Sequence, residues 1–211
     1  MNIIKKEYED PDFVKHYTEE NFNNPKMHDK LEEFAKLLNG NKVIDIGCGP
    51  GHDAYKFADL GFEAIGIDFS KEMIKTANSM LDDRKNPKFE VMDMLDIKTN
   101  FETNIFDGVW ACASVLFIPH ESVDLVLEGI TSVTKDNGMI YICFKEGENL
   151  ISTGLRNKYG VEREHKEYLW SEQAIKNKFK KHNFKIVKLW RNFTGKKRGQ
   201  PTRWMNFYLQ K

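Results

Sequence analysis

A twelve-residue segment, KVIDIGCGPGHD at positions 42–53, constrains the fold of this chain more than any other stretch. Its first half is an apolar run typical of a buried strand, and its second half carries Gly47, Gly49 and Gly51 at alternate positions. Glycines between a strand and a helix permit a tight turn and let a ligand approach the backbone closely. The segment therefore predicts a strand, a ligand-binding turn and the start of a helix.

The chain after this segment alternates between two periodicities. Short apolar runs bounded by turn residues indicate strands, and apolar residues three or four apart indicate helices. The expected strands cover residues 42–47, 63–69, 88–95, 106–118 and 138–144, and the expected helices cover residues 52–61, 70–81 and 121–133. This alternation implies right-handed crossovers and an α/β fold, with a mostly parallel sheet covered by helices on both faces.

Two helices are expected before the first strand, in residues 9–22 and 24–40, with Asp10 as the N-cap of the first. The chain therefore divides into an N-terminal helical lid, residues 1–41, and an α/β domain, residues 42–211.

The C-terminal third shows a different pattern. Residues 145–170 have no clear period and are expected to be a long excursion over the edge of the sheet, and such long loops in compact domains are more often functional or mobile than decorative. Residues 171–184 indicate a helix, and residues 185–193 and 202–211 indicate two strands. Only about eight residues join these strands, so they should pair antiparallel.

Composition limits the class of protein. The chain has 211 residues, enough for one domain with a full core, and it has 32 basic and 32 acidic residues. This balance gives no reason to expect nucleic acid or a membrane surface as a partner. The sequence contains neither an apolar run of about 18 residues nor a secretory signal, so a cytoplasmic location is expected. Monomer and dimer both remain open.

Three cysteines, Cys48, Cys112 and Cys143, form no CxxC pair, and no histidine lies at metal-ligand spacing from them. They are expected to be reduced, structural thiols, and no metal site is expected.

Asp68 ends the second expected strand, 21 positions after Gly47. An acid there can accept hydrogen bonds from both ribose hydroxyls of an adenine nucleoside. Dinucleotide-binding folds usually show GxGxxG, whereas this turn reads GxGxG and is preceded by Asp45. The segment resembles the E/D-x-G-x-G-x-G signature of class I S-adenosylmethionine (SAM)-dependent methyltransferases, and the resemblance covers the chain from about residue 40 to its end.

The resemblance implies a three-layer sandwich around a seven-stranded, mostly parallel sheet whose last strand is antiparallel, with SAM as the cofactor. In such enzymes an acid after the third strand binds the adenine amino group, which assigns Asp93, although a turn-capping acid is the alternative reading. The fourth strand ends beneath the methionine portion of the cofactor. The N-terminal helices cover the site as a lid, and the excursion at 145–170 is expected to form part of the acceptor site. The cofactor-binding residues expected in this way are Tyr17, Asp45, Gly47, Cys48, Gly49, Gly51, Asp68, Phe69, Asp93, Met94, Ala111 and Cys112.

The resemblance says less about the methyl acceptor. Methyltransferases that act on exocyclic amines of DNA carry an Asn/Asp-Pro-Pro-aromatic motif after the fourth strand, where this chain has ACAS. Those that act on cytosine carbon need a cysteine nucleophile in a different setting. Metal-dependent enzymes need clustered carboxylates, yet no acid lies between Asp107 and Glu121. The expectation is metal-free, in-line transfer to an N, O or S atom of a small molecule.

A general base is needed only if the acceptor arrives protonated. His120 and Tyr17 are the candidates, with His16 and His165 behind them, and Tyr17 fits a cofactor lid better than a catalyst. Aromatic residues at 168–170 and 203–205 fit either core packing or an acceptor pocket.

Other activities stay open beside this one. The basic hairpin at 191–203 fits a solvated turn, an anionic acceptor or RNA, so an RNA methyltransferase is one alternative. An NAD-dependent oxidoreductase and a non-catalytic cofactor-binding protein are the others.

Overall fold

The computed structural model describes residues 7–22, 27–148, 150–159, 161–197 and 200–211. At residues 155–158, 161–163, 165, 196–197 and 200–201 it describes the backbone alone. The helices are α2 Pro11–Asn21, α3 His28–Ala35, α4 His52–Asp59, α5 Lys71–Ser79, α6 Ile97–Asn100, α7 Val123–Val133 and α8 Glu172–Lys181, with short 3₁₀ turns at Met94–Asp96 and Val115–Phe117. The strands are β1 Lys42–Ile46, β2 Glu63–Asp68, β3 Lys88–Val91, β4 Phe106–Ala111, β5 Thr134–Lys145, β6 Ile151–Lys158, β7 Val161–Tyr168, β8 Lys185–Lys197 and β9 Gln200–Gln210.

Seven strands form one sheet in the order β3-β2-β1-β4-β5-β9-β8. Strands β1 to β5 pair in parallel, whereas β9 runs antiparallel to both of its neighbours, β5 and β8. The expected α/β fold with an antiparallel last strand is therefore confirmed.

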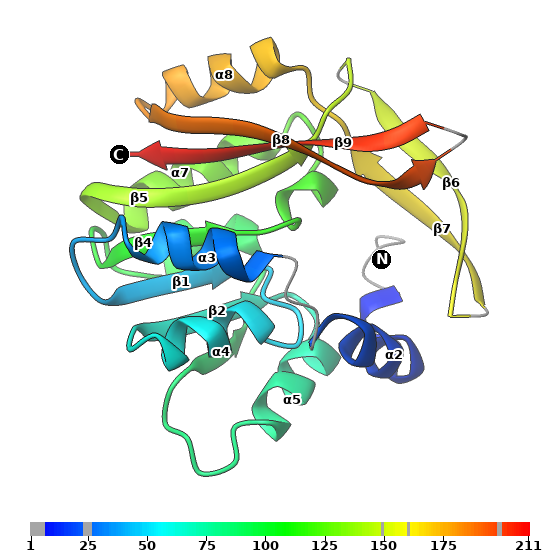
Figure 1. Ribbon diagram of the computed structural model, residues 1–211, viewed down its shortest axis with the longest axis horizontal. Coiled ribbons are helices and arrows are strands. Elements are labelled where there is room, and N and C mark those ends of the chain that lie inside the picture. Colours follow the sequence, from blue (N-terminus) through cyan, green and yellow to red (C-terminus); the bar gives the residue numbers. More distant parts are fainter. Residues whose placement is uncertain (1–6, 23–26, 149, 160, 198–199) are drawn as a thin grey trace.

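Helices cover both faces of this sheet (Figure 1). On one face α6, α7 and α8 bury apolar side chains such as Ile130 and Phe179 against the strands. On the other face α3, α4 and α5 pack an aromatic core in which Phe34 and Phe57 surround Trp110. The two cores give the three-layer sandwich its hydrophobic stabilisation.

The N-terminal helices form where the sequence predicts them. Asp10 caps α2 by accepting hydrogen bonds from the backbone N–H groups of Asp12 and Phe13, both at 3.0 Å. Helix α3 is shorter than expected, because it ends at Ala35 and the chain then turns before β1.

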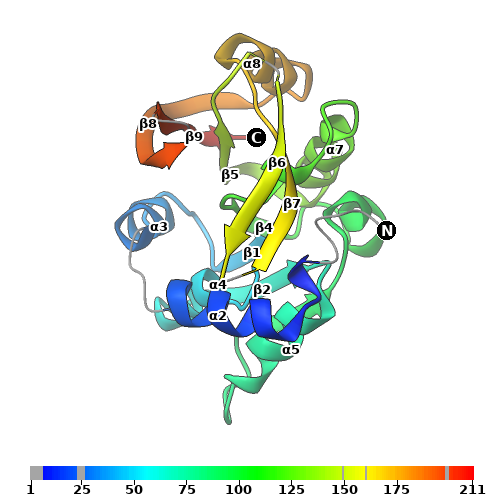
Figure 2. The ribbon, with the colours of Figure 1, turned by 90° about the vertical axis from the view of Figure 1, so that its right-hand side faces the viewer.

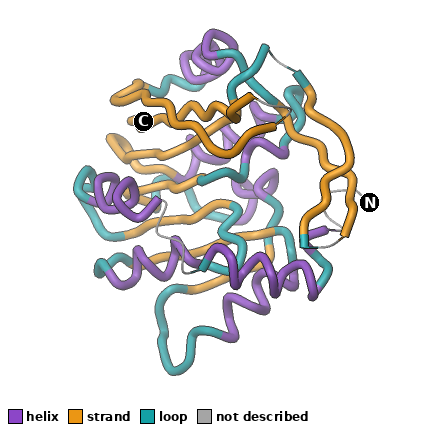
Figure 3. The backbone as a smooth tube through the Cα atoms, turned by 45° about the vertical axis from the view of Figure 1, so that its right-hand side comes forward, coloured by secondary structure: helices purple, strands orange, loops and turns teal. Residues whose placement is uncertain are grey.

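Residues 145–170 are an ordered hairpin rather than a long loop. Strands β6 and β7 pair antiparallel from Ile151↔Tyr168 to Lys158↔Val161 and form a separate two-stranded sheet. Figure 2 and Figure 3 show this hairpin running across the end of the main sheet toward α2. The sequence of β7, VEREHKEY, is almost wholly polar, so it lacks the alternation of apolar residues that marks a strand.

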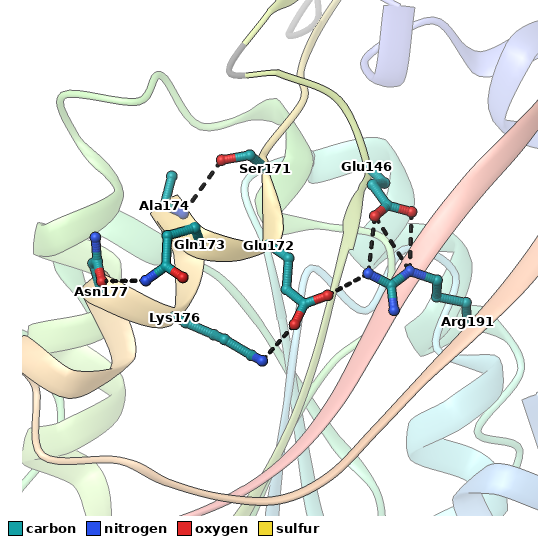
Figure 4. Close-up of polar contacts among 8 residues, drawn as sticks. All are labelled: Glu146, Ser171, Glu172, Gln173, Ala174, Lys176, Asn177 and Arg191. Carbon is teal, nitrogen blue, oxygen red and sulfur yellow. Dashed lines mark hydrogen bonds and ion pairs between the residues drawn. The ribbon is translucent and has the colours of Figure 1, made fainter.

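Ion pairs anchor the base of this hairpin. Arg191 of β8 contacts Glu146, which follows β5, at 2.9 Å, and it also contacts Glu172 at the start of α8 (Figure 4). Lys176 binds the same Glu172, so the two acids share two cations. Arg191 is therefore engaged within the fold. The side chains of Lys196, Lys197 and Arg198 lie outside those that the structure describes.

Candidate functional site

A cavity of 630 Å³ lies at the carboxyl ends of β1, β2 and β4. Strand β1 pairs with β2 on one side and with β4 on the other, so the order in which successive strands are added to the sheet reverses at β1. Ligands of open α/β sheets bind at this kind of switch point. Every residue expected to bind a cofactor lines the cavity except Gly51 and Ala111.

The glycine turn joins β1 to α4. The N–H groups of Gly47 and Cys48 both donate to the carbonyl oxygen of Ile67, at 2.8 and 3.0 Å, which holds the turn against β2. Gly47 has a φ of +73°, and a Cβ there would lie 2.4 Å from the Cβ of Ser114. Gly51, at φ +88°, faces Phe89 instead of the cavity, so it serves packing.

Asp68 closes β2 beside this turn. One carboxylate oxygen accepts from Gly49 N–H at 3.0 Å and the other from Ser70 N–H at 2.9 Å. Each oxygen keeps a lone pair for a further donor. Burial raises the pKa of Asp68 to about 6, although these two hydrogen bonds act in the opposite direction.

Two more carboxylates are buried beneath the turn. Asp53, on the first turn of α4, accepts a hydrogen bond from Trp110 Nε1 at 2.7 Å. Burial, followed by the charges of Asp53 and Asp68, raises the pKa of Asp45 well above its usual range. Within the described part of the chain, Asp45 Oδ2 and Asp53 Oδ1 have no hydrogen-bond partner. Such buried oxygens are costly unless a ligand pairs with them.

His52 follows the glycine turn and lines the same cavity. Its Nε2 lies 3.6 Å from Asp53 Oδ1, and its Nδ1 has no hydrogen-bond partner among the described residues. A histidine next to a carboxylate in a cavity can accept a proton from a bound molecule.

Asp93 and Met94 form the wall beyond β3. Asp93 caps a 3₁₀ turn by accepting from Leu95 N–H at 3.2 Å. It thus has the turn-capping role considered from the sequence, and it lines the cavity as well.

The N-terminal segment closes the cavity from the outside. Tyr8 lies edge-on to Tyr17, Phe69 and Phe117, with ring centroids 6.0 to 6.1 Å apart. Its backbone oxygen accepts a hydrogen bond from the hydroxyl of Ser70. Burial, followed by the charge of Cys112 and nearby acids, raises the pKa of Tyr17, so its phenol is neutral.

The β6–β7 hairpin reaches the same helix. At its tip Tyr159 donates to Glu20, stacks on His16 with centroids 5.4 Å apart and contacts Phe13 at the same separation. The tip of the hairpin is therefore in contact with α2 (Figure 2), and the same helix supplies Tyr17 to the cavity lining.

Two other histidine candidates, His120 and His16, lie outside the cavity lining. His120 hydrogen-bonds the carbonyl oxygen of Leu169 through Nε2 at 2.9 Å and packs edge-on against Trp170. His16 bonds the backbone oxygen of Asp12 at 2.7 Å. The side chain of His165 lies outside those that the structure describes.

Several lining residues escaped sequence reasoning. They are Tyr8, Asn21, Met27, His52, Asp53, Met92, Leu95, Ala113, Ser114, Phe117, Ile118, Pro119, Ser122 and Thr194. His52 and Asp53 carried a local signal, because they follow the glycine turn at the start of a helix. Thr194 carried none, because only the fold brings β8 to this place. Trp204, from the expected aromatic segment 203–205, lines the cavity, whereas Trp170 is buried elsewhere in the core.

Among the described residues, no three His, Cys, Asp or Glu side chains form a group able to hold a metal ion. No helix in the described part of the chain has the length and apolar character needed to cross a bilayer.

Known proteins resemble this chain in sequence. A family model described as a methyltransferase domain matches residues 37–205. Demethylmenaquinone methyltransferase of Bacillus pumilus (strain SAFR-032) is 25% identical over 165 residues, which cover 72% of this chain and 70% of that protein. Phosphoethanolamine N-methyltransferase 2 of Caenorhabditis elegans is 30% identical over 129 residues, 58% of this chain and 29% of that protein. The chain spans about half the length of the first curated relatives it matches.

A solved structure resembles it in fold. A SAM-dependent methyltransferase of Methanosarcina mazei has a TM-score of 0.72 at 17% sequence identity, over 85% of this chain and 96% of that one. At this identity the likeness concerns the fold alone.

Proposed function

The chain belongs to the methyltransferase-domain family, and from that premise we propose that it transfers a methyl group from SAM to a small molecule. The observation that carries the proposal is the group of buried acids at the ends of β1 and β2 and the start of α4, where Asp45 Oδ2 and Asp53 Oδ1 have no hydrogen-bond partner among the described residues.

These acids fit SAM better than a dinucleotide. SAM carries a sulfonium, an ammonium and no phosphate, so carboxylates such as Asp45 attract it. The pyrophosphate of NAD would instead lie close to buried acids and be repelled by them. This argument disfavours the oxidoreductase alternative.

The proposed roles follow the walls of the cavity. Asp68 accepts hydrogen bonds from the ribose hydroxyls with its free lone pairs, and Asp45 pairs with the ammonium group, whose positive charge favours the ionised carboxylate against the effect of burial. Asp93 and the backbone of Met94 hold the adenine. Tyr17 and the rest of residues 1–41 act as a lid, and the excursion at 145–170 closes the acceptor side.

Bound SAM supplies an activated methyl group, so the protein has little covalent chemistry to perform. Its residues hold the acceptor in line with the methyl carbon and exclude water. If the acceptor arrives protonated, His52 receives the proton at its unpaired Nδ1 while Asp53 stabilises the imidazolium.

We propose a neutral or cationic acceptor. Among the described residues that line the cavity there are four aspartates and neither lysine nor arginine. The rings of Tyr8, Phe117 and Trp204 suit a flat apolar molecule or a cationic amine. By charge, this lining suits a quinone-like acceptor, as in the name of one relative, better than a phosphorylated amine, as in the name of another.

Calorimetry with S-adenosylhomocysteine and NAD tests the cofactor. We expect S-adenosylhomocysteine to bind one per chain and NAD to release no heat; the reverse result would refute the proposal. Methyl-labelled SAM is then incubated with a cell extract separated into small metabolites and RNA. Label in a metabolite supports the proposed acceptor class, label in RNA indicates an RNA methyltransferase, and binding without label indicates a non-catalytic protein.

A further inference from the structure

Two of the three cysteines lie side by side at the floor of the cavity. The register of β4 and β5 pairs Ala111 with Ile142; Cys143 is the next residue of β5, and Cys112 is the first residue after β4. Two positions earlier on the same face, Trp110 and Tyr141 stack with ring centroids 4.0 Å apart. A hydrogen bond between the two cysteine side chains, followed by burial, raises the pKa of the Cys112 thiol well above its usual range.

The two thiols differ in their exposure and in their hydrogen bonds. Cys112 is half-buried and lines the cavity, so a small oxidant can reach it. Cys143 is buried, and its sulfur accepts a hydrogen bond from Ala113 N–H at 3.1 Å. Hydrogen bonds from Cys112 and Ala113 lower the pKa of the Cys143 thiol despite its burial. The sulfur of Cys143 can therefore take up the proton of Cys112, the thiol that faces the cavity, when Cys112 is oxidised.

We propose that Cys112 and Cys143 are a site of reversible oxidation by peroxides, and that the resulting disulfide weakens cofactor binding. The proton of the Cys112 thiol passes to the sulfur of Cys143, and the sulfur of Cys112 attacks hydrogen peroxide. Its S–O bond forms as the O–O bond breaks, and the departing hydroxide takes up a proton and leaves as one water. The sulfur of Cys143 then attacks the sulfenic acid on Cys112, the S–S bond forms, and the second water leaves. Two thiols and one peroxide thus give one disulfide and two waters.

The link changes the floor of the cavity. Neighbouring strands lie about 4.7 to 4.9 Å apart, within the range of about 4.4 to 6.8 Å that a disulfide spans between its two Cα atoms. The bond fixes the side chain of Cys112 against Cys143. Cys112, Ala113 and Ser114 all line the cavity, so this change alters the surface on which the cofactor would lie. Because Cys112 lines the cavity, a thiol reductant can reach the disulfide and reduce it again.

Mass spectrometry of the folded protein after hydrogen peroxide treatment tests the disulfide. We expect free thiols to fall from three to one, with Cys112 and Cys143 joined in one peptide pair that dithiothreitol separates. A link to Cys48, oxidation of Cys112 to sulfinic acid without a link, or full resistance of the folded protein would overturn the proposal.

Two variants serve as controls. Cys143→Ser removes the partner, so Cys112 should remain a sulfenic acid that dimedone labels. Cys48→Ser should still form the link, because the thiol of Cys48 donates to the carbonyl oxygen of Gly49 and not to another cysteine. Thermal unfolding of each reduced variant verifies that it is folded.

The effect on the cofactor site rests on the proposed function. We expect the oxidised protein to bind S-adenosylhomocysteine at least fivefold more weakly than the reduced protein, and dithiothreitol to restore the affinity. An affinity unchanged by the link would overturn the coupling. A reduced protein that binds no S-adenosylhomocysteine would refute the proposed function instead, while the masses still decide whether the disulfide forms.

Discussion

The proposed role of Asp68 can be tested through the pH dependence of ligand binding. Its pKa of about 6 lies well above that of a free carboxyl because the side chain is buried. Ribose hydroxyls donate to the ionised form, so binding must remove the proton below this pH. We expect the affinity for S-adenosylhomocysteine, measured by calorimetry, to be constant above pH 7 and to fall about tenfold per pH unit below pH 6.

Asp68→Asn isolates this residue. The side-chain amide has a single oxygen that can accept hydrogen bonds. It therefore cannot accept from Gly49 N–H, Ser70 N–H and the ribose hydroxyls at the same time. The affinity at pH 7.5 should drop about tenfold or more, and the fall near pH 6 should disappear. Asp83→Asn, at an exposed aspartate, is the matched control and should change neither. A break near pH 6 that persists in Asp68→Asn would assign the titration to another group.

His52→Gln tests the proton acceptor. Glutamine keeps a polar side chain of similar length but cannot take a proton at neutral pH. With an acceptor that must lose a proton, we expect kcat to fall about 100-fold with little change in KM, while affinity for S-adenosylhomocysteine stays within about twofold. His28→Gln, at the start of α3, should keep full turnover. Equal losses of cofactor affinity and kcat would instead make His52 a binding residue.

The sequence predicts some of these residues and not others for a physical reason. Asp45 and Asp68 end buried strands, and strand ends in a parallel sheet meet at one edge, so position alone places them at the site. His120 also follows a strand, yet its ring packs on Trp170 behind that edge. Local pattern cannot say to which side of the edge a loop residue turns, and Tyr8 and Thr194 reach the site only through tertiary packing.

At the scale of the element, helix α2 is the part of the lid that one variant can release. Phe13 is 3% exposed and packs on Tyr8, Tyr17 and Tyr159. Truncation of a buried phenylalanine costs about 3 to 5 kcal/mol, which is enough to undock a short helix outside the main core. Phe13→Ala should therefore weaken S-adenosylhomocysteine binding at least about tenfold and expose α2 to protease.

Phe193→Ala supplies the control for that experiment. Phe193 is 59% exposed on β8, so its removal should leave affinity and protease resistance unchanged. If Phe13→Ala binds as tightly as the unaltered protein, α2 is not a lid.

The elements themselves were predictable to the extent that they bury apolar side chains. Strands β1 to β5 and helices α4, α5 and α7 repeat apolar residues with a clear period, and each forms at the expected place in the chain. The strands expected at 88–95 and 106–118 are shorter, because they end at Val91 and Ala111 and 3₁₀ turns follow, whereas β5 begins earlier than expected, at Thr134. The β6–β7 hairpin was missed because β-pairing of its backbone, and not burial of an apolar face, makes it a strand pair. A short connection between β8 and β9 sufficed to predict their antiparallel pairing.

At the scale of the whole molecule, the site is assembled from three distant parts of the chain. The β1–α4 turn and the ends of β2 and β4 supply the polar floor, the N-terminal segment supplies aromatic cover, and β8 and β9 supply Thr194 and Trp204. The first part has a sequence motif and the others have none. For this reason the sequence predicts which cofactor binds, whereas the residues on the proposed acceptor side of the cavity can be identified only from the fold.

The buried acids also set how stability depends on pH. Asp45 and Asp68 have pKa values raised by burial, so the folded protein takes up protons that the unfolded chain, with ordinary carboxyl pKa values, takes up only at lower pH. Without ligand, the free energy of unfolding measured in urea should therefore rise as the pH falls from 7 to 5, by about 1 kcal/mol from Asp68 alone. Below about pH 4 this gain should reverse, because Asp124 and Glu172, whose pKa values cations lower, then lose their ion pairs.

Bound ligand should abolish most of this rise between pH 7 and 5. S-adenosylhomocysteine at 100 times its Kd adds about 2.7 kcal/mol at pH 7, and a tenfold loss of affinity at pH 5 halves that contribution. The stabilisation by ligand therefore shrinks over the interval in which the free protein gains stability. In Asp68→Asn, the stability of the free protein and the stabilisation by ligand should both depend less on pH between 7 and 5. Parallel changes with and without ligand would mean that proton uptake and cofactor binding involve different carboxylates, and Asp68 would lose its assignment to the ribose.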